Sequence, residues 1–152
     1  MTQYLKVHFL SQRGDWETPQ ELFDELDHEF GFDLDACATK ENAKCPIFFS
    51  PDDDALKLDW RGVVWMNPPY GREIGLWVAK AFESALLGAT VVCLLPARTD
   101  TRYFHSFCGG SELVHAEIRF IKGRLHFDGK GPAPFPSMIV IFRPEVENDV
   151  RD

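Results

Sequence analysis

The residues best suited to chemistry follow a short apolar run, Val63–Met66, and have the sequence Asn67-Pro68-Pro69-Tyr70. The apolar run predicts a buried strand, and the prolines must end it because they lack the N–H group that a sheet requires. The side-chain oxygen of Asn67 and the carbonyl oxygen of Pro68 are then two hydrogen-bond acceptors at the carboxyl end of a strand. In open α/β sheets, ligands bind at that end.

This arrangement suits the methylation of an exocyclic amine. The amino group of adenine is a poor nucleophile because its lone pair is delocalised into the ring, and two acceptors on its N–H bonds would localise that pair. Preorganised dipoles also stabilise charge that develops in the transition state, and Tyr70 would stack on a flipped base. The pattern is the NPPY motif of the amino-methyltransferases, which use S-adenosylmethionine (SAM) as methyl donor. A strand followed by a proline-rich turn with a surface tyrosine is the alternative.

Helices and strands are expected on both sides of this motif. Thr18 is a suitable N-cap, Pro19 suits the first helical position and Glu21 completes a capping box, so a helix is predicted over 19–30. A second helix is predicted over 74–87, where Trp77 belongs to an apolar stripe that we assign to core packing. Further strands are predicted near 7–10, over 32–38 and 47–49, at 90–96, within 112–121, at 123–127 and over 137–142, with a short helix over 101–108.

Two aspartates stand where a ligand would need a polar partner. Asp35 falls where the strand 32–38 gives way to a loop, so its carboxylate is placed to accept from an ammonium or ribose group, while 36–38 are small residues that let a ligand approach the backbone. A turn cap is the alternative for Asp35. Asp54 precedes Ala55 and is placed to accept a hydrogen bond from an adenine amine. The acidic run 52–54 is more often a solvated loop than a metal site.

The composition favours a single α/β domain. The chain has 152 residues, of which 45% are hydrophobic, and this suits one well-packed core. The apolar run 90–96 favours a mostly parallel sheet. No stretch resembles a membrane span or an export signal, and the four cysteines show no CxxC spacing, so we expect a cytoplasmic protein without a structural metal.

The charge of the chain limits how it meets nucleic acid. Its net charge of −8 argues against broad, charge-driven binding. A local basic face is still compatible with the sequence, and ordinary solvated surface is the alternative. The basic residues concerned all lie in the second half of the chain and are Arg98, Arg102, Arg119, Lys122, Arg124 and Lys130.

Taken together, these segments resemble the phage-type DNA N-6-adenine methyltransferases, the Dam family of phages and prophages. The resemblance runs from about Trp16 to Phe142, nearly the whole chain, and is far more specific than the NPPY motif alone. The matching segments are Trp16–Pro19, Leu22-Phe23, Phe32–Ala38, Asn42-Ala43, Asp53–Leu56, Trp60, Trp65–Arg72, Leu95–Asp100, Gly123–Phe127 and Ala133–Ser137.

The resemblance implies a compact SAM-dependent methyltransferase (Rossmann-like) α/β fold over 1–152, with flanking helices and no separate target-recognition domain. It also implies methyl transfer to N6 of adenine in DNA, inside a bacterial host cell. The residues that it assigns to SAM are Trp16, Thr18, Pro19, Asp35, Ala36, Cys37, Asp54, Ala55 and Asn67. Those that it assigns to catalysis or to the DNA are Asn67, Pro68, Pro69, Tyr70, Arg72, Arg124 and Phe127.

Several alternatives stay open at the level of sequence. The same chemistry serves RNA adenine, cytosine N4 or a protein glutamine amide, and a catalytically silent module that binds DNA or SAM belongs to a different class. The intact Asn67 and Tyr70 argue against the silent module, which has no chemical need of them. Because no segment is left for a recognition domain, loops must read the DNA bases, so we expect a short or loose recognition sequence or a homodimer.

Overall fold

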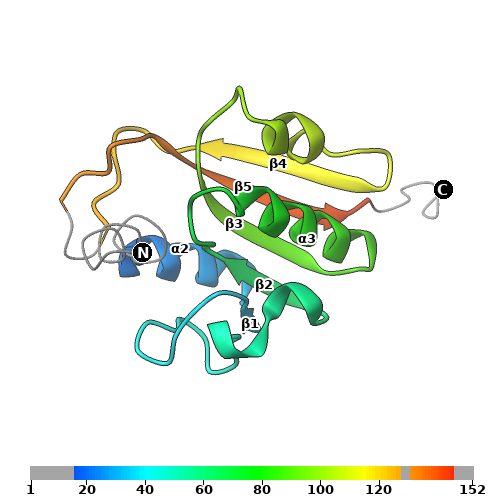
Figure 1. Ribbon diagram of the computed structural model, residues 1–152, viewed down its shortest axis with the longest axis horizontal. Helices are drawn as coiled ribbons and strands as arrows, with labels where there is room; N and C mark the ends of the chain where they lie inside the picture. The colour runs from blue at the N-terminus through cyan, green and yellow to red at the C-terminus, as the bar shows by residue number, and fades with distance from the viewer. Residues whose placement is uncertain (1–15, 128–130, 146–152) are drawn as a thin grey trace, which may run out of the picture.

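The computed structural model describes residues 16–127 and 131–145, which build one five-stranded sheet with helices on its faces (Figure 1). The strand order is β1-β2-β3-β5-β4. Because β5 is antiparallel to both β3 and β4, four strands point one way and β5 runs against them. The expected mostly parallel α/β sheet is therefore confirmed. The strands are β1 (Leu34–Asp35), β2 (Val63–Met66), β3 (Thr90–Pro96), β4 (Val114–Phe120) and β5 (Ser137–Pro144).

Two α-helices cover opposite faces of this sheet, α2 (Gln20–Phe30) and α3 (Ile74–Leu86). Phe23 of α2 packs edge-on against Trp65 of β2, with ring centroids 5.6 Å apart. Phe82 of α3 packs against Phe142 of β5 at 6.0 Å. Trp65 of β2 is paired with Val92 of β3, which is in turn paired with Ile141 of β5. Phe142 is the next residue of β5 after Ile141. Since successive side chains of a strand point to opposite faces, α2 and α3 lie on different sides (Figure 1).

The core lies between these layers and consists mainly of apolar side chains. The middle strands β2, β3 and β5 hold most of the fully buried side chains, among them Val64, Val91, Leu94 and Ile141. Each contributes about 1.5–3 kcal/mol by its transfer from water. The continuous apolar run of β3 reflects this, because that strand is covered on both faces. A rigid centre of this kind fixes the loops that leave the carboxyl ends of β1, β2 and β3.

Four local predictions are wrong. Thr18 is not the N-cap of α2: Pro19 occupies that position and has no side-chain polar atom to form a cap bond, while the Thr18 hydroxyl accepts from Asn67 Nδ2. Only Leu34–Asp35 of the stretch 32–38 is a strand, and 47–49 joins it through a single bridge at Phe48. The stretch 123–127 forms no strand either, since Gly123 takes a left-handed φ of 78° and turns the chain.

The remaining predictions concern the short helix, the first strand and the membrane. The helix predicted over 101–108 is present as a wide π-helical turn at Phe104–Cys108. The strand predicted near 7–10 lies outside the described residues. In the part of the chain that the structure describes, no helix is long and apolar enough to cross a membrane.

Candidate active site

The carboxyl ends of β1 and β2 open into one cavity of about 650 Å³. The two strands are parallel neighbours, with Asp35 in register with Trp65, so Asp35 and the motif after Met66 emerge at the same edge of the sheet. Cavities of this size, with apolar walls and few polar groups, are typical small-molecule sites. Of the residues assigned to SAM from the sequence, Trp16, Thr18, Asp35, Ala36, Cys37, Asp54, Ala55 and Asn67 line the cavity.

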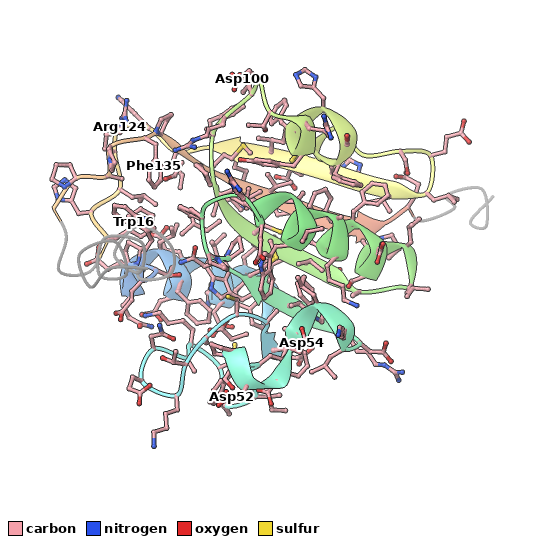
Figure 2. All side chains as sticks on the ribbon, in the orientation of Figure 1. Trp16, Asp52, Asp54, Asp100, Arg124 and Phe135 are labelled. Carbon is pink, nitrogen blue, oxygen red and sulfur yellow. The ribbon has the colours of Figure 1, made fainter. Side chains whose placement is uncertain are left out.

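The opposite walls of this cavity come from distant parts of the chain. Trp16 stands before α2, and Asp54 lies in the loop before β2. Asp54 joins the short 3-10 helices Pro51–Asp53 and Ala55–Lys57. Figure 2 shows Asp54 and Asp52 in the lower part of the molecule, and Trp16 toward the other side, near Phe135. A ligand that fills the cavity would therefore touch both segments. Sequence separation alone gives no hint of this pairing.

The side chain of Asn67 is held in one orientation. Its Nδ2 donates to the Trp16 carbonyl oxygen at 2.6 Å and to Thr18 Oγ1 at 3.0 Å. A backbone carbonyl can only accept, so the amide nitrogen must face Trp16 and the oxygen must face away. Asn67 Oδ1 is buried and has no hydrogen-bond partner among the described residues. An unpaired buried acceptor costs about 1–3 kcal/mol, so a hydrogen bond from a donor group to this atom would be stabilising.

Thr18 supports that orientation, and its removal makes a test. The side chain is only 3% exposed, and Val replaces the hydroxyl by a methyl group of similar size. We expect Thr18→Val to lower stability by about 1–3 kcal/mol, because one N–H of Asn67 loses its partner, and to lower turnover by about tenfold. Thermal unfolding and initial rates measure the two effects. Thr18→Ser keeps the hydroxyl, and equal losses in both variants would contradict this role.

Asp35 is a buried carboxylate at the end of β1. It is 2% exposed, and its oxygens accept from the backbone N–H groups of Cys37 at 3.3 Å and Lys44 at 3.0 Å. Burial raises its pKa to about 6, against the effect of these two bonds. The Lys44 ammonium is bonded instead to Gln20 Oε1 at 2.7 Å. Asp35 therefore forms no ion pair within the described ranges, and a cationic ligand group would stabilise its charged form.

The other cavity residues shape the site. Burial raises the pKa of the Cys37 thiol to about 12, so this cysteine is a small neutral wall residue and no nucleophile. The Ala55 carbonyl oxygen is taken by Trp60 Nε1 at 3.0 Å. Asp54 has a left-handed φ of 54° and forms an exposed ion pair with Lys57 at 3.4 Å. Its carboxylate is thus on the solvent side of the cavity.

The sequence reading missed several cavity residues, of which Trp77 is the most informative. It belongs to the apolar stripe of α3 and packs against the core as predicted, with its ring centroid 6.1 Å from that of Trp60, and it also lines the cavity. Its Nε1–H is buried and has no partner among the described residues. A tryptophan that follows Asn67 by ten positions, in the first turn of the next helix, was the available signal. Asn42, Lys44, Phe49 and Glu73 also line the cavity.

Not all predicted site residues gather here. Pro19 lies outside the cavity lining, at the start of α2. Tyr70 and Arg72 line a separate groove. Phe127 is 1% exposed and packs on the ring of Trp16, with centroids 5.1 Å apart, so it supports the cavity wall. Arg124 is exposed and lines neither space, and Figure 2 shows it at the outer side of the molecule, far from Asp54.

Tyr70 is fixed by the sheet. Its hydroxyl donates to the Leu94 carbonyl oxygen at 3.2 Å, and its ring meets Phe135 edge-on at 5.5 Å. Burial raises the pKa of this hydroxyl, so it stays protonated. The tyrosine therefore anchors the end of the motif to β3, and one part of it faces the separate groove. Stacking on a base stays a prediction for this residue.

Comparison with known proteins agrees with this geometry. The family model described as DNA N-6-adenine-methyltransferase (Dam) matches residues 7–150. A DNA N-6-adenine-methyltransferase of Haemophilus phage HP1 is 32% identical over 143 residues, which cover 89% of this chain and 82% of that protein. One of Escherichia phage T1 is 39% identical over 92 residues, 59% of this chain and 38% of that protein.

A solved structure gives the same fold class. The protein comes from Pyrococcus horikoshii and is named provisionally as an RNA methyltransferase. The superposition has a TM-score of 0.50 at 18% sequence identity and covers 96% of this chain and all of the other. At this identity the likeness concerns the fold alone, and it supports the Rossmann-like arrangement of sheet and helices described above.

Proposed function

Because this chain belongs to the DNA N-6-adenine-methyltransferase (Dam) family and so is an adenine-specific DNA methyltransferase, we propose that the cavity at β1 and β2 binds SAM and that Asn67 holds the target amine. The observation that carries this proposal is the buried Oδ1 of Asn67, which is oriented by two bonds on the other end of its amide. A site prepared for an N–H donor is what an amino-methyltransferase requires.

The cavity suits SAM in size and in chemistry. About 650 Å³ accommodates a nucleoside-sized ligand. The methionine part of SAM carries an ammonium group, and Asp35 offers a carboxylate without an ion-pair partner within the described ranges. The small side chains of Ala36 and Cys37 leave room beside it. Asp54 and Ala55 border the far end, where the adenine of SAM would lie, and Trp77 offers an unused donor.

When bound, SAM supplies an electrophilic methyl group. The chain contributes two acceptors: Asn67 Oδ1 takes one N–H of the adenine amine and the Pro68 carbonyl oxygen takes the other. These bonds localise the nitrogen lone pair and stabilise the positive charge that develops on that nitrogen. One amine proton must then leave, and it passes to solvent, because the neutral amide of Asn67 is not a base. Catalysis by this chain is therefore electrostatic and positional.

Reading of the DNA sequence is part of the proposal. The described residues hold one sheet with two α-helices, so we assign base reading to loops rather than to a second domain. A short or loose recognition sequence follows, and a homodimer would add surface on the DNA. We propose the cytoplasm of a bacterial host as the location of this activity, because DNA is the substrate.

Product analysis tests the activity. Purified protein is incubated with methyl-labelled SAM and, separately, unmethylated DNA, RNA and a glutamine-containing peptide, and the digests are analysed by mass spectrometry. We expect N6-methyladenine from DNA as the main product. Arg61→Ala, which changes an exposed side chain outside the cavity lining, should match the native rate. N4-methylcytosine, or methylation of RNA or peptide alone, would overturn the proposed substrate. SAM binding without any product would favour a silent binding module.

A further inference from the structure

A second hollow of about 690 Å³, which we call the arginine groove, lies beside the motif and has no role in the proposed chemistry. Its walls come from Tyr70–Arg72, from the first half of α3 and from the loop after β3. Three arginines stand in these walls, namely Arg72, Arg98 and Arg102, together with the hydroxyl residues Thr101 and Ser106. No carboxylate is among the residues that line it.

The charge of the arginine groove is not neutralised. Arg72, Arg98 and Arg102 are exposed and form no ion pair within 16–127 and 131–145. Other arginines of the described ranges do form ion pairs: Arg61 pairs with Asp59 at 3.0 Å, and Arg119 pairs with Glu29 at 2.7 Å. In a chain of net charge −8, three guanidinium groups without an ion pair in the described ranges thus surround one hollow and make it locally positive.

The walls of the arginine groove are held in place by the sheet. Tyr103 donates to the Pro96 carbonyl oxygen at 3.0 Å, and Thr101 Oγ1 donates to the Arg98 carbonyl oxygen at 2.7 Å. The Arg98 guanidinium lies over the Phe135 ring, 5.8 Å from its centroid. Asp100, the one acid in this loop, is at the loop tip in Figure 2 and does not line the groove. The positive charges are thus presented on a fixed frame.

We propose that the arginine groove binds backbone phosphates of the DNA strand that carries the target adenine. This inference rests on the proposed function. The NPPY motif divides the two spaces, since Asn67, Pro68 and Pro69 line the cavity while Tyr70 lines the groove. Five residues span at most about 18 Å, so Arg72 stays near Asn67. Duplex DNA carries one negative charge per about 1.7 Å of axis, so phosphates close to a flipped adenine fall within reach.

The chemistry of arginine fits phosphate in particular. A guanidinium group binds two phosphate oxygens at once through parallel N–H bonds. Such contacts position the DNA without reading its sequence. They also offset the electrostatic repulsion between this net negative protein and DNA, because the arginine groove attracts phosphates locally. The groove therefore supplies affinity and register, and the motif supplies the chemistry.

Salt dependence of DNA binding tests the proposal. Fluorescence anisotropy with a labelled unmethylated duplex gives the slope of log K against log salt for the native protein, for Arg72→Ala, Arg98→Ala and Arg102→Ala, and for their combination. Each lost phosphate contact should reduce the magnitude of the slope by about 0.9, so the slope of the combined variant should be smaller by between two and three. Its affinity should fall equally for duplexes of different sequence. Arg61→Ala removes the same charge outside the groove and should leave the slope unchanged.

Two further measurements separate the possible failures. SAM affinity by calorimetry should be the same in all variants, because these arginines lie outside the cavity. If the native protein methylates DNA and the combined variant keeps the native slope, the groove proposal alone is wrong. If the native protein does not bind DNA at all, the groove proposal is also wrong. If it binds DNA through the groove but yields no N6-methyladenine, the proposed function fails and the phosphate site stands.

Discussion

Replacing Asn67 with alanine is expected to lower turnover by about 10²–10³-fold or more, while SAM affinity stays largely unchanged. The reason is the proposed role of its Oδ1, which has no hydrogen-bond partner among the described residues and which we propose holds the target amine. Loss of one preorganised hydrogen-bond group in a site of this kind costs that much in rate. An interaction made mainly in the transition state affects rate more than binding of the donor. Single-turnover rates and SAM calorimetry on both proteins measure the two quantities.

The hydrogen bonds of the Asn67 amide provide matched controls. Asn67→Ala also removes the bonds to Trp16 and Thr18, and these residues line the cavity. Thr18→Val breaks only one of those bonds and leaves Oδ1 in place, so its loss of rate should be far smaller. Asn67→Asp keeps an oxygen for the amine but sets a second acceptor against the Trp16 carbonyl oxygen, so an intermediate rate is expected. Equal losses of rate and SAM affinity in Asn67→Ala would instead make Asn67 a cofactor residue.

Much of the site was predictable because it lies at strand ends marked in the sequence. Proline cannot continue a sheet, so the motif had to terminate β2, and it does so directly after Met66. Asp35 was expected near the end of its strand because the small residues 36–38 follow it, and the strand indeed ends at Asp35, although it has only two residues. Parallel pairing of β1 with β2 then brings both residues to one cavity. The residues that end each strand, together with the rule that parallel strands have their carboxyl ends at the same edge of a sheet, were sufficient for this prediction.

The rest depends on contacts between distant segments, which local patterns do not encode. Thr18 has every local feature of an N-cap, but a partner 49 positions away takes its hydroxyl. The resemblance assigns Phe127 to catalysis or to the DNA, and the structure buries this side chain against Trp16. The arginine groove joins Arg72 to Arg98 and Arg102 across two strand ends. Each case is a choice between two uses of one side chain, and tertiary packing makes that choice.

Asp35 should make the stability of the protein depend on pH. Its pKa is about 6 in the folded protein against 3.8 for an ordinary aspartate, so the folded state binds more protons than the unfolded state between these values. Stability therefore falls as pH rises. Relative to Asp35→Asn, which does not titrate, the native protein should lose up to about 3 kcal/mol between about pH 4 and about pH 7. Denaturant unfolding of both proteins without SAM measures this difference.

Binding of SAM should show the opposite dependence at the same group. An ammonium group beside Asp35 stabilises the ionised carboxylate, so SAM affinity should increase as pH rises through about 6 in the native protein and stay flat in Asp35→Asn. Titrations are kept below about pH 7, because an α-amino group itself loses its proton near 8. A native affinity that does not change with pH would remove Asp35 from contact with the cation, even if the stability profile is as expected. The pair of profiles thus separates the cost of burying this carboxylate from its use in binding.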